Sequence, residues 1–147
     1  MNNDLSKMQQ RGETSILVAE RGPAARESLS ELFRDEGYQV LEAPDSASAI
    51  NHINNNEGVH VILTDLDMPA WHSIIRHARA VVPNAFILCM VGCASNYDVT
   101  EAQRLGAHSH FLKPLEFVDL HQSIQNLLAG NPYDEATPRK RPLGAAR

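Results

Sequence analysis

The sequence predicts an α/β fold in which a doubly wound parallel sheet is covered by helices on both faces. Five short apolar runs alternate along the chain with five segments whose apolar residues recur at helical spacing. The runs are apolar along their whole length, which is typical of strands buried on both faces. Strands that alternate with helices in this way are joined by right-handed crossovers into one sheet. The length of 147 residues is enough for one domain whose core needs no metal or disulfide.

Each predicted element has its own signal. The strands are expected at the apolar runs, over residues 15–19, 39–43, 61–63, 86–91 and 110–112. The helices are expected between and after them, over residues 23–36, 46–53, 74–81, 97–105 and 117–128. Five strands therefore alternate with five helices.

The first two helices have recognisable ends. Pro23 suits the first turn of a helix, and Gly37 ends the segment in which apolar residues recur at helical spacing. Asp45 or Ser46 can cap the second helix, and the polar run 54–58 ends it.

The later elements end in the same way. A short helix follows Pro69, and the next helix is closed by Gly106. Pro114 follows the fifth strand, and Gly130 stops the last, amphipathic helix.

The composition indicates the cellular location of the protein and the partners that it can bind. No apolar run approaches the roughly 20 residues of a membrane span, so we expect a cytoplasmic protein with no membrane insertion. Residues 14–130, the predicted folded domain, are acidic, which disfavours direct nucleic-acid binding by this domain. Residues 1–13 are expected to be flexible, and residues 131–147 to form a disordered basic tail or linker. Cys89 and Cys93 are expected to be buried or half-buried thiols.

Charged side chains follow the carboxyl ends of the predicted strands. Glu20 and Arg21 come after the first strand, Asp65 and Asp67 after the third, and Lys113 after the fifth. In open parallel sheets the ligand site lies outside this edge. Carboxylates that face a lysine suit a divalent cation and a phosphoryl group, because hard oxygens hold Mg²⁺ and lysine neutralises phosphate. An aspartate can itself be the nucleophile and form an aspartyl phosphate.

The chain resembles the receiver domain of bacterial two-component response regulators. The resemblance covers residues 15–129 and rests on ILVAE at 16–20, ILTDLDMP at 62–69, EAQRLGA at 101–107 and FLKP at 111–114. It implies a flavodoxin-like sheet with strand order 2-1-3-4-5, and it makes 14–130 the receiver domain.

The resemblance also implies roles for the residues at the sheet edge. By this match Asp65 is the phosphoacceptor, and Lys113 contacts the phosphoryl group. Glu20 is the first acid of the metal-binding pair, so Mg²⁺ is the implied cofactor. Asp67 falls where the family donates a backbone carbonyl to the metal and varies in side chain. Glu20, Asp65 and Asp67 are therefore the candidate metal ligands.

The implied partners are proteins. A sensor histidine kinase or a phosphotransfer protein would donate the phosphoryl group to Asp65. A downstream target would bind the face formed by the fourth predicted helix, the fifth strand and the fifth helix, and a homodimer is an open alternative. We expect no enzymatic activity beyond self-catalysed phosphotransfer and dephosphorylation at Asp65.

Several positions depart from the family pattern. Arg21 replaces the usual second metal-binding acid, Val91 replaces a hydroxyl residue that bonds the phosphoryl group, and His110 replaces the aromatic switch. The loop after Pro69 reads Ala-Trp-His-Ser instead of ending in Asp-Gly. We expect weaker Mg²⁺ binding and slower phosphorylation, because the guanidinium of Arg21 can pair with a carboxylate in the place of the metal.

Two functions therefore remain open at this stage. The first is a phosphorylated receiver, favoured by Asp65 and Lys113. The second is a degenerate receiver that acts as a phosphorylation-independent protein-binding scaffold, favoured by Arg21 and Val91. A third class, a flavodoxin-like enzyme or flavin carrier, is disfavoured because no Gly- and Ser/Thr-rich phosphate loop follows the first strand.

For four side chains near the site, the sequence predicts a structural environment rather than a catalytic role. His108 and His110 share a face of the fifth strand, but two histidines without a third ligand are a weak metal signal. His110 is expected to be half-buried. Trp71 is expected to be exposed on a loop, as a partner contact or a lid, and the side chain of Asp67 to face water.

Overall fold

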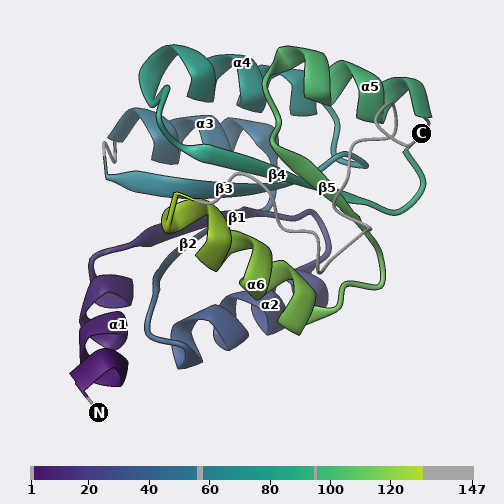
Figure 1. Cartoon of the computed structure of the whole chain (residues 1–147). Helices are drawn as coiled ribbons and strands as arrows, with labels where there is room; N and C mark the ends of the chain where they lie inside the picture. The colour runs from purple at the N-terminus through teal and green to yellow at the C-terminus, as the bar shows by residue number, and fades with distance from the viewer. Residues whose placement is uncertain (1, 56–57, 95, 131–147) are drawn as a thin grey trace.

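The computed structural model describes residues 2–55, 58–94 and 96–130. Within these residues, five strands and six helices alternate along the chain (Figure 1). The predicted tail 131–147 lies outside the described residues. Among the described helices, none combines the length and the apolar content that a bilayer crossing requires.

All five strands form one parallel sheet. Their bounds are β1 (Ser15–Ala19), β2 (Gln39–Ala43), β3 (Val59–Asp65), β4 (Phe86–Val91) and β5 (Ser109–Leu112). The strand order is β2-β1-β3-β4-β5, and every neighbouring pair is parallel. The predicted fold class and strand order are confirmed.

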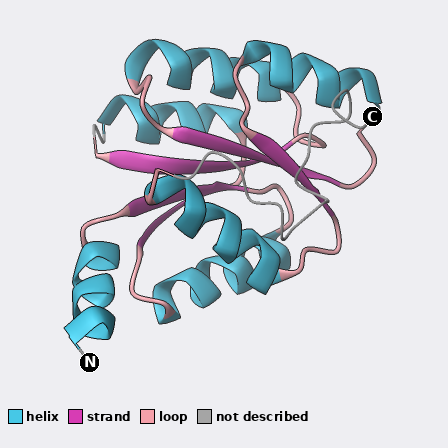
Figure 2. Ribbon diagram, in the orientation of Figure 1, coloured by secondary structure: helices cyan, strands magenta, loops and turns pink. Residues whose placement is uncertain are grey.

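Five of the six described helices lie in two layers, one on each face of the sheet (Figure 1). The bounds of all six are α1 (Asn2–Gly12), α2 (Pro23–Asp35), α3 (Ser46–Asn55), α4 (Trp71–Val81), α5 (Asn96–Leu105) and α6 (Phe117–Leu128). Figure 2 shows α3, α4 and α5 on one face and α2 and α6 on the other. The described residues thus hold one helix more than the predicted five, because α1 precedes the first strand (Figure 1).

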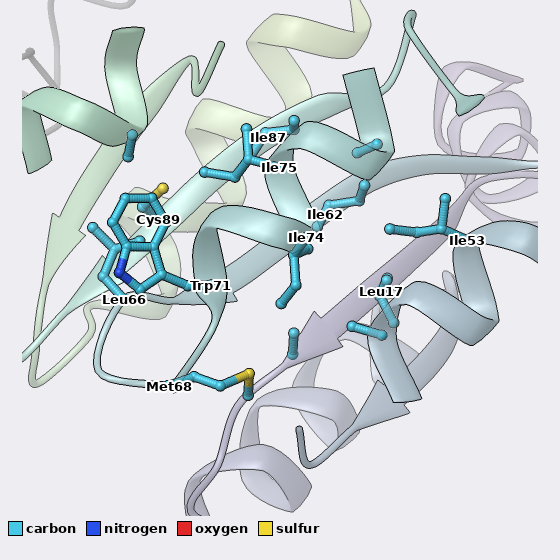
Figure 3. Close-up of a cluster of buried hydrophobic side chains, with 14 of the residues drawn as sticks. Leu17, Ile53, Ile62, Leu66, Met68, Trp71, Ile74, Ile75, Ile87 and Cys89 are labelled. Carbon is cyan, nitrogen blue, oxygen red and sulfur yellow. The ribbon is translucent and has the colours of Figure 1, made fainter. Parts of the chain in front are cut away.

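The two faces of the sheet carry separate cores. Along each strand, successive side chains point to opposite faces, so one strand contributes to both. Leu17, Ile62 and Ile87 belong to the cluster beneath α3, α4 and α5, part of which Figure 3 shows. Their neighbours Ile16, Leu63 and Leu88 belong to the cluster beneath α2 and α6. Burial on both faces explains why these strands are apolar along their length.

Trp71 lies in the core, and the predicted exposed position is wrong. Its side chain is 4% exposed and packs in the first cluster with Leu66 and Cys89 (Figure 3). The reason is that α4 begins at Trp71, directly after Ala70 in a left-handed conformation with φ 63°. The sharp turn at Ala70 sends the indole under the helix.

Of three further burial predictions, the one for Cys89 is confirmed, and those for Cys93 and His110 are wrong. Cys89 is buried as expected, but Cys93 is exposed, because it lies in the loop after β4. His110 is 5% exposed and therefore fully buried, since β5 is covered at this position.

Arg11 attaches the last turn of α1 to the domain. Its Nη1 donates to the Glu36 carboxylate at 2.9 Å and to the Glu36 carbonyl at 3.2 Å. Its guanidinium also lies 5.7 Å from the centre of the Tyr38 ring. These contacts join α1 to the turn between α2 and β2.

Candidate functional site

Glu20, Asp65 and Lys113 meet at the carboxyl edge of the sheet. Glu20 follows β1, Asp65 is the last residue of β3, and Lys113 follows β5. The lysine Nζ lies 2.9 Å from Glu20 Oε1 and 3.2 Å from Asp65 Oδ1. The structure therefore brings together the three residues that the sequence assigned to one site.

The site holds two buried carboxylates with one lysine between them. Glu20 is 4% exposed and Asp65 is 1% exposed, whereas 27% of the Lys113 side chain is exposed. Burial lowers the pKa of Lys113, but the hydrogen bond that it donates to Glu20 and the negative charges of Asp65 and Glu20 outweigh this effect. The pKa of Lys113 is raised as a result. The lysine is thus a permanent cation in this pocket at neutral pH.

Backbone N–H groups hold both carboxylates in place. The Gly22 N–H donates to Glu20 Oε2 at 2.9 Å, and the Asp67 N–H donates to Asp65 Oδ1 at 2.9 Å. Charge-assisted hydrogen bonds of this kind are stronger than neutral ones and fix the orientation of the carboxylate. The two acids are therefore preorganised around the lysine.

Asp67 is partly exposed, but its carboxylate is held by backbone hydrogen bonds, which the prediction of a side chain facing water did not include. Its Oδ2 accepts the Gly92 N–H at 3.0 Å, and the Cys93 N–H lies 3.0 Å from Oδ1 and 3.2 Å from Oδ2. From the sequence, Cys93 was considered only for its thiol, and neither backbone N–H was assigned to the site. A glycine directly after an apolar strand was the available signal, because it permits close approach of a side chain to the backbone.

Arg21 does not take the place of a metal ion in this structure. Its side chain is exposed, on the turn between β1 and Pro23. In the part of the chain that is described, Lys113 is the cation within ion-pair distance of Glu20 and Asp65. In the described residues Arg21 makes no ion pair with Glu20 or Asp65, whose partner is instead Lys113.

Val91 and His110, the two predicted switch positions, are both buried. Val91 is 5% exposed and has no hydroxyl group. His110 is buried, and within the described residues its Nδ1 has no hydrogen-bond partner. Burial lowers the pKa of His110. His108 instead accepts the Ile87 N–H on its Nδ1 at 3.0 Å.

Two of the three predicted metal ligands, Glu20 and Asp65, lie close together, and both are paired with Lys113. Mg²⁺ binds through one or two carboxylates and keeps several waters, and the buried pair of Glu20 and Asp65 suits that chemistry. The carboxylate of Asp67 is instead bonded to the loop after β4. Across the described residues, no group of three or more acidic, histidine or cysteine side chains could hold a metal ion.

The fold and the site together define a class of protein. The chain forms a doubly wound α/β domain, and two buried acids and a lysine lie at the carboxyl edge of its sheet. The chain belongs to the response regulator receiver domain family, whose family model matches residues 16–125. This family is the signalling module of two-component systems.

Two curated relatives illustrate the match. Sporulation initiation phosphotransferase F of Bacillus subtilis (strain 168) is 25% identical over 115 residues, which are 77% of this chain and 92% of that protein. The TorCAD operon transcriptional regulatory protein TorR of Escherichia coli (strain K12) is 27% identical over 114 residues. That match covers 77% of this chain and 49% of TorR, so the chain spans about half the length of that regulator.

Solved structures share the fold. The response regulator receiver domain protein (CheY-like) of Methanospirillum hungatei JF-1 has a TM-score of 0.74 and 23% identity over 80% of this chain and 95% of that one. A chain from the co-crystal of the Saccharomyces cerevisiae phosphotransfer protein Ypd1 with the Ssk1 receiver domain has a TM-score of 0.69 and 18% identity. It covers 78% of this chain and 88% of that one.

Proposed function

We propose that this receiver domain accepts a phosphoryl group on Asp65 from the phosphohistidine of a sensor histidine kinase or phosphotransfer protein. The observation that carries the proposal is the buried Asp65 carboxylate at the end of β3, with Lys113 Nζ at 3.2 Å. In the transfer, an Asp65 oxygen bonds to phosphorus, the bond from phosphorus to the donor nitrogen breaks, and that histidine takes a proton from water.

The residues around Asp65 have separate tasks in this reaction. Lys113 neutralises charge on the phosphoryl oxygens, which is the main work of a protein in phosphoryl transfer. Glu20 and Asp65 would hold Mg²⁺, which when bound offsets further negative charge on the transferring group. We expect this metal to bind weakly, because Arg21 adds a positive charge where the family has an acid.

The partner classes are proteins. The names of two similar proteins support this: one is a sporulation phosphotransferase, and another was crystallised with a histidine phosphotransfer protein. A downstream protein target would bind the face of α5, β5 and α6. In the described chain, the three most exposed large apolar side chains come from these elements: Tyr97 at 69%, Leu112 at 54% and Val118 at 76%.

Intact-protein mass spectrometry tests the proposal. After incubation with Mg²⁺ and a small-molecule phosphodonor such as acetyl phosphate, the parent chain should gain the mass of one phosphoryl group. Asp65→Asn should gain none. Asp35→Asn is the matched control, because Asp35 is an exposed acid at the end of α2, and it should be modified like the parent. An adduct that persists in Asp65→Asn would overturn the assignment.

A second candidate function is a phosphorylation-independent scaffold. The observation that favours it is that Lys113 already forms ion pairs with both buried acids without a metal or a phosphoryl group. Val91 in addition has no hydroxyl with which to bond a phosphoryl group. Under this reading the parent shows no adduct with phosphodonor and Mg²⁺, and Asp65→Asn binds the protein target as tightly as the parent does.

A further inference from the structure

The loop after β4 carries two backbone N–H groups that converge on one carboxylate. Gly92 and Cys93 are consecutive, and both donate to Asp67 at 3.0 Å. Successive N–H groups that point into the same space form an anion-binding concavity. The anion in this concavity is a side chain of the protein itself.

The position of Asp67 is imposed by its neighbours in the chain. Leu66 and Met68 are 3% and 1% exposed and pack in the core on either side of it (Figure 3). The Asp67 N–H donates to Asp65 Oδ1 at 2.9 Å. With the backbone anchored at these points, the carboxylate is directed at the loop.

Gly92 admits the carboxylate because it has no side chain. A Cβ at this position would lie 2.7 Å from Asp67 Oδ2 and 3.5 Å from Lys113 Cδ. Lys113 in turn contacts Asp65 through its Nζ. Gly92 therefore lies beside both Asp67 and Lys113, and Lys113 connects this loop to Asp65.

We propose that Asp67 is a positioning residue that occupies the concavity formed by the Gly92 and Cys93 N–H groups, here called the oxyanion site. Its carboxylate holds the loop between β4 and α5 before any phosphoryl group is present. A phosphoryl group on Asp65 has to displace it from the Gly92 and Cys93 N–H groups. The hold on the loop stands independently, whereas the displacement rests on the proposed function.

Amide hydrogen exchange measured by NMR tests the hold on the loop. Gly92 and Cys93 are exposed, so their amides have no burial to slow exchange once the carboxylate is gone. In the full chain without Mg²⁺ or phosphodonor, Asp67→Ala should speed exchange at both amides by roughly tenfold to a hundredfold. Asp67→Asn keeps one acceptor oxygen and should give a smaller increase. Asp35→Ala is the matched control and should leave both amides slow.

Inorganic phosphate tests the oxyanion site without any phosphotransfer. In a phosphate titration, the Gly92 and Cys93 amide resonances should shift in Asp67→Ala and stay in place in the parent. Gly92→Ala adds a steric test, because its Cβ meets Asp67 Oδ2. Gly92→Ala should lower the stability of the parent but not that of Asp67→Ala, in which the clashing carboxylate is absent.

The outcomes separate this inference from the proposed function. Unchanged exchange at both amides in Asp67→Ala, or equal phosphate shifts in parent and variant, would refute the inference. With acetyl phosphate and Mg²⁺, Asp67→Ala should accumulate phosphoryl adduct roughly tenfold faster than the parent, since two charge-assisted hydrogen bonds no longer compete. An Asp65 that accepts no phosphoryl group, with the amides behaving as expected, refutes the proposed function and supports the hold on the loop.

Discussion

Lys113→Met should destabilise the protein by about 3 kcal/mol, since it leaves two buried acids without a cation. At an effective dielectric constant of about 20, each ion pair of Lys113, at 2.9 and 3.2 Å, has a gross Coulomb energy of about 5 to 6 kcal/mol. Desolvation of the lysine offsets part of this energy. Removing one partner of a buried pair costs about 3 to 5 kcal/mol, and the 27% exposure of Lys113 places the expected loss at the low end.

Urea denaturation at pH 7 and low salt measures this loss. The fluorescence of Trp71, the single tryptophan and a buried one, reports unfolding. With a slope of about 2 kcal/mol per molar urea, the midpoint should fall by roughly 1.5 M. Lys7→Met is the control, because Lys7 is exposed, and its midpoint should stay near that of the parent. A midpoint for Lys113→Met within roughly 0.3 M of the parent would refute the claim that this lysine neutralises the site.

Mg²⁺ supplies an independent check on the same variant. A cation that binds the folded state stabilises it in proportion to the logarithm of its concentration over its dissociation constant. Mg²⁺ should therefore raise the midpoint of Lys113→Met more than that of the parent, in which the lysine occupies the acids. An equal response of both proteins would mean that the lysine and the metal do not share this site.

Three further perturbations follow from the described contacts. Burial lowers the pKa of His110 in the folded chain, so on acidification the imidazole is protonated more readily in the unfolded chain. The parent therefore loses stability as the pH falls below about 6.5. His110→Phe should reduce that loss, measured as the difference in urea midpoint between neutral and mildly acidic pH. Ala70 has φ 63°, a left-handed conformation that glycine adopts more easily than alanine, so Ala70→Gly should stabilise the fold by about 0.5 to 1 kcal/mol. Thermal unfolding measures this gain, and a lower melting temperature would contradict it. Arg21→Asp should raise Mg²⁺ affinity roughly tenfold at low salt and increase phosphorylation at Asp65. Calorimetry measures the affinity and mass spectrometry the phosphorylation. Unchanged affinity would contradict the claim that the positive charge of Arg21 weakens Mg²⁺ binding.

The strands could be predicted from the sequence because each is an apolar run that ends in polar residues. β1, β2 and β4 begin and end at the predicted residues. Charges that follow such strands must lie at one edge of a parallel sheet, and this is why Glu20, Asp65 and Lys113 could be assigned to one site. The apolar runs and the topology of a parallel sheet were sufficient for these predictions.

The direction of loop side chains could not be predicted in the same way. Trp71 is buried because the chain turns sharply at Ala70, and nothing in the letters Ala-Trp-His-Ser specifies that turn. Asp67 reaches Gly92 and Cys93, residues 25 and 26 positions later, and only the folded sheet brings them together. Contacts of this kind depend on tertiary packing rather than on local pattern.

The helix α1 escaped prediction for a different reason. Its sequence, NNDLSKMQQRG, has too few apolar residues for a helical stripe to be recognised. Arg11 anchors its last turn to Glu36, 25 residues further along the chain. This ion pair is a tertiary contact, which cannot be predicted from the local sequence.

The different environments of the two cysteines make the chain ready for site-specific labelling. Burial raises the pKa of the Cys89 thiol to about 12, so this group stays protonated and shielded from thiol reagents. Cys93 is exposed on the loop after β4, and its backbone N–H, not its side chain, bonds to Asp67. A maleimide dye attached to the native chain should therefore report on this loop without any engineered cysteine.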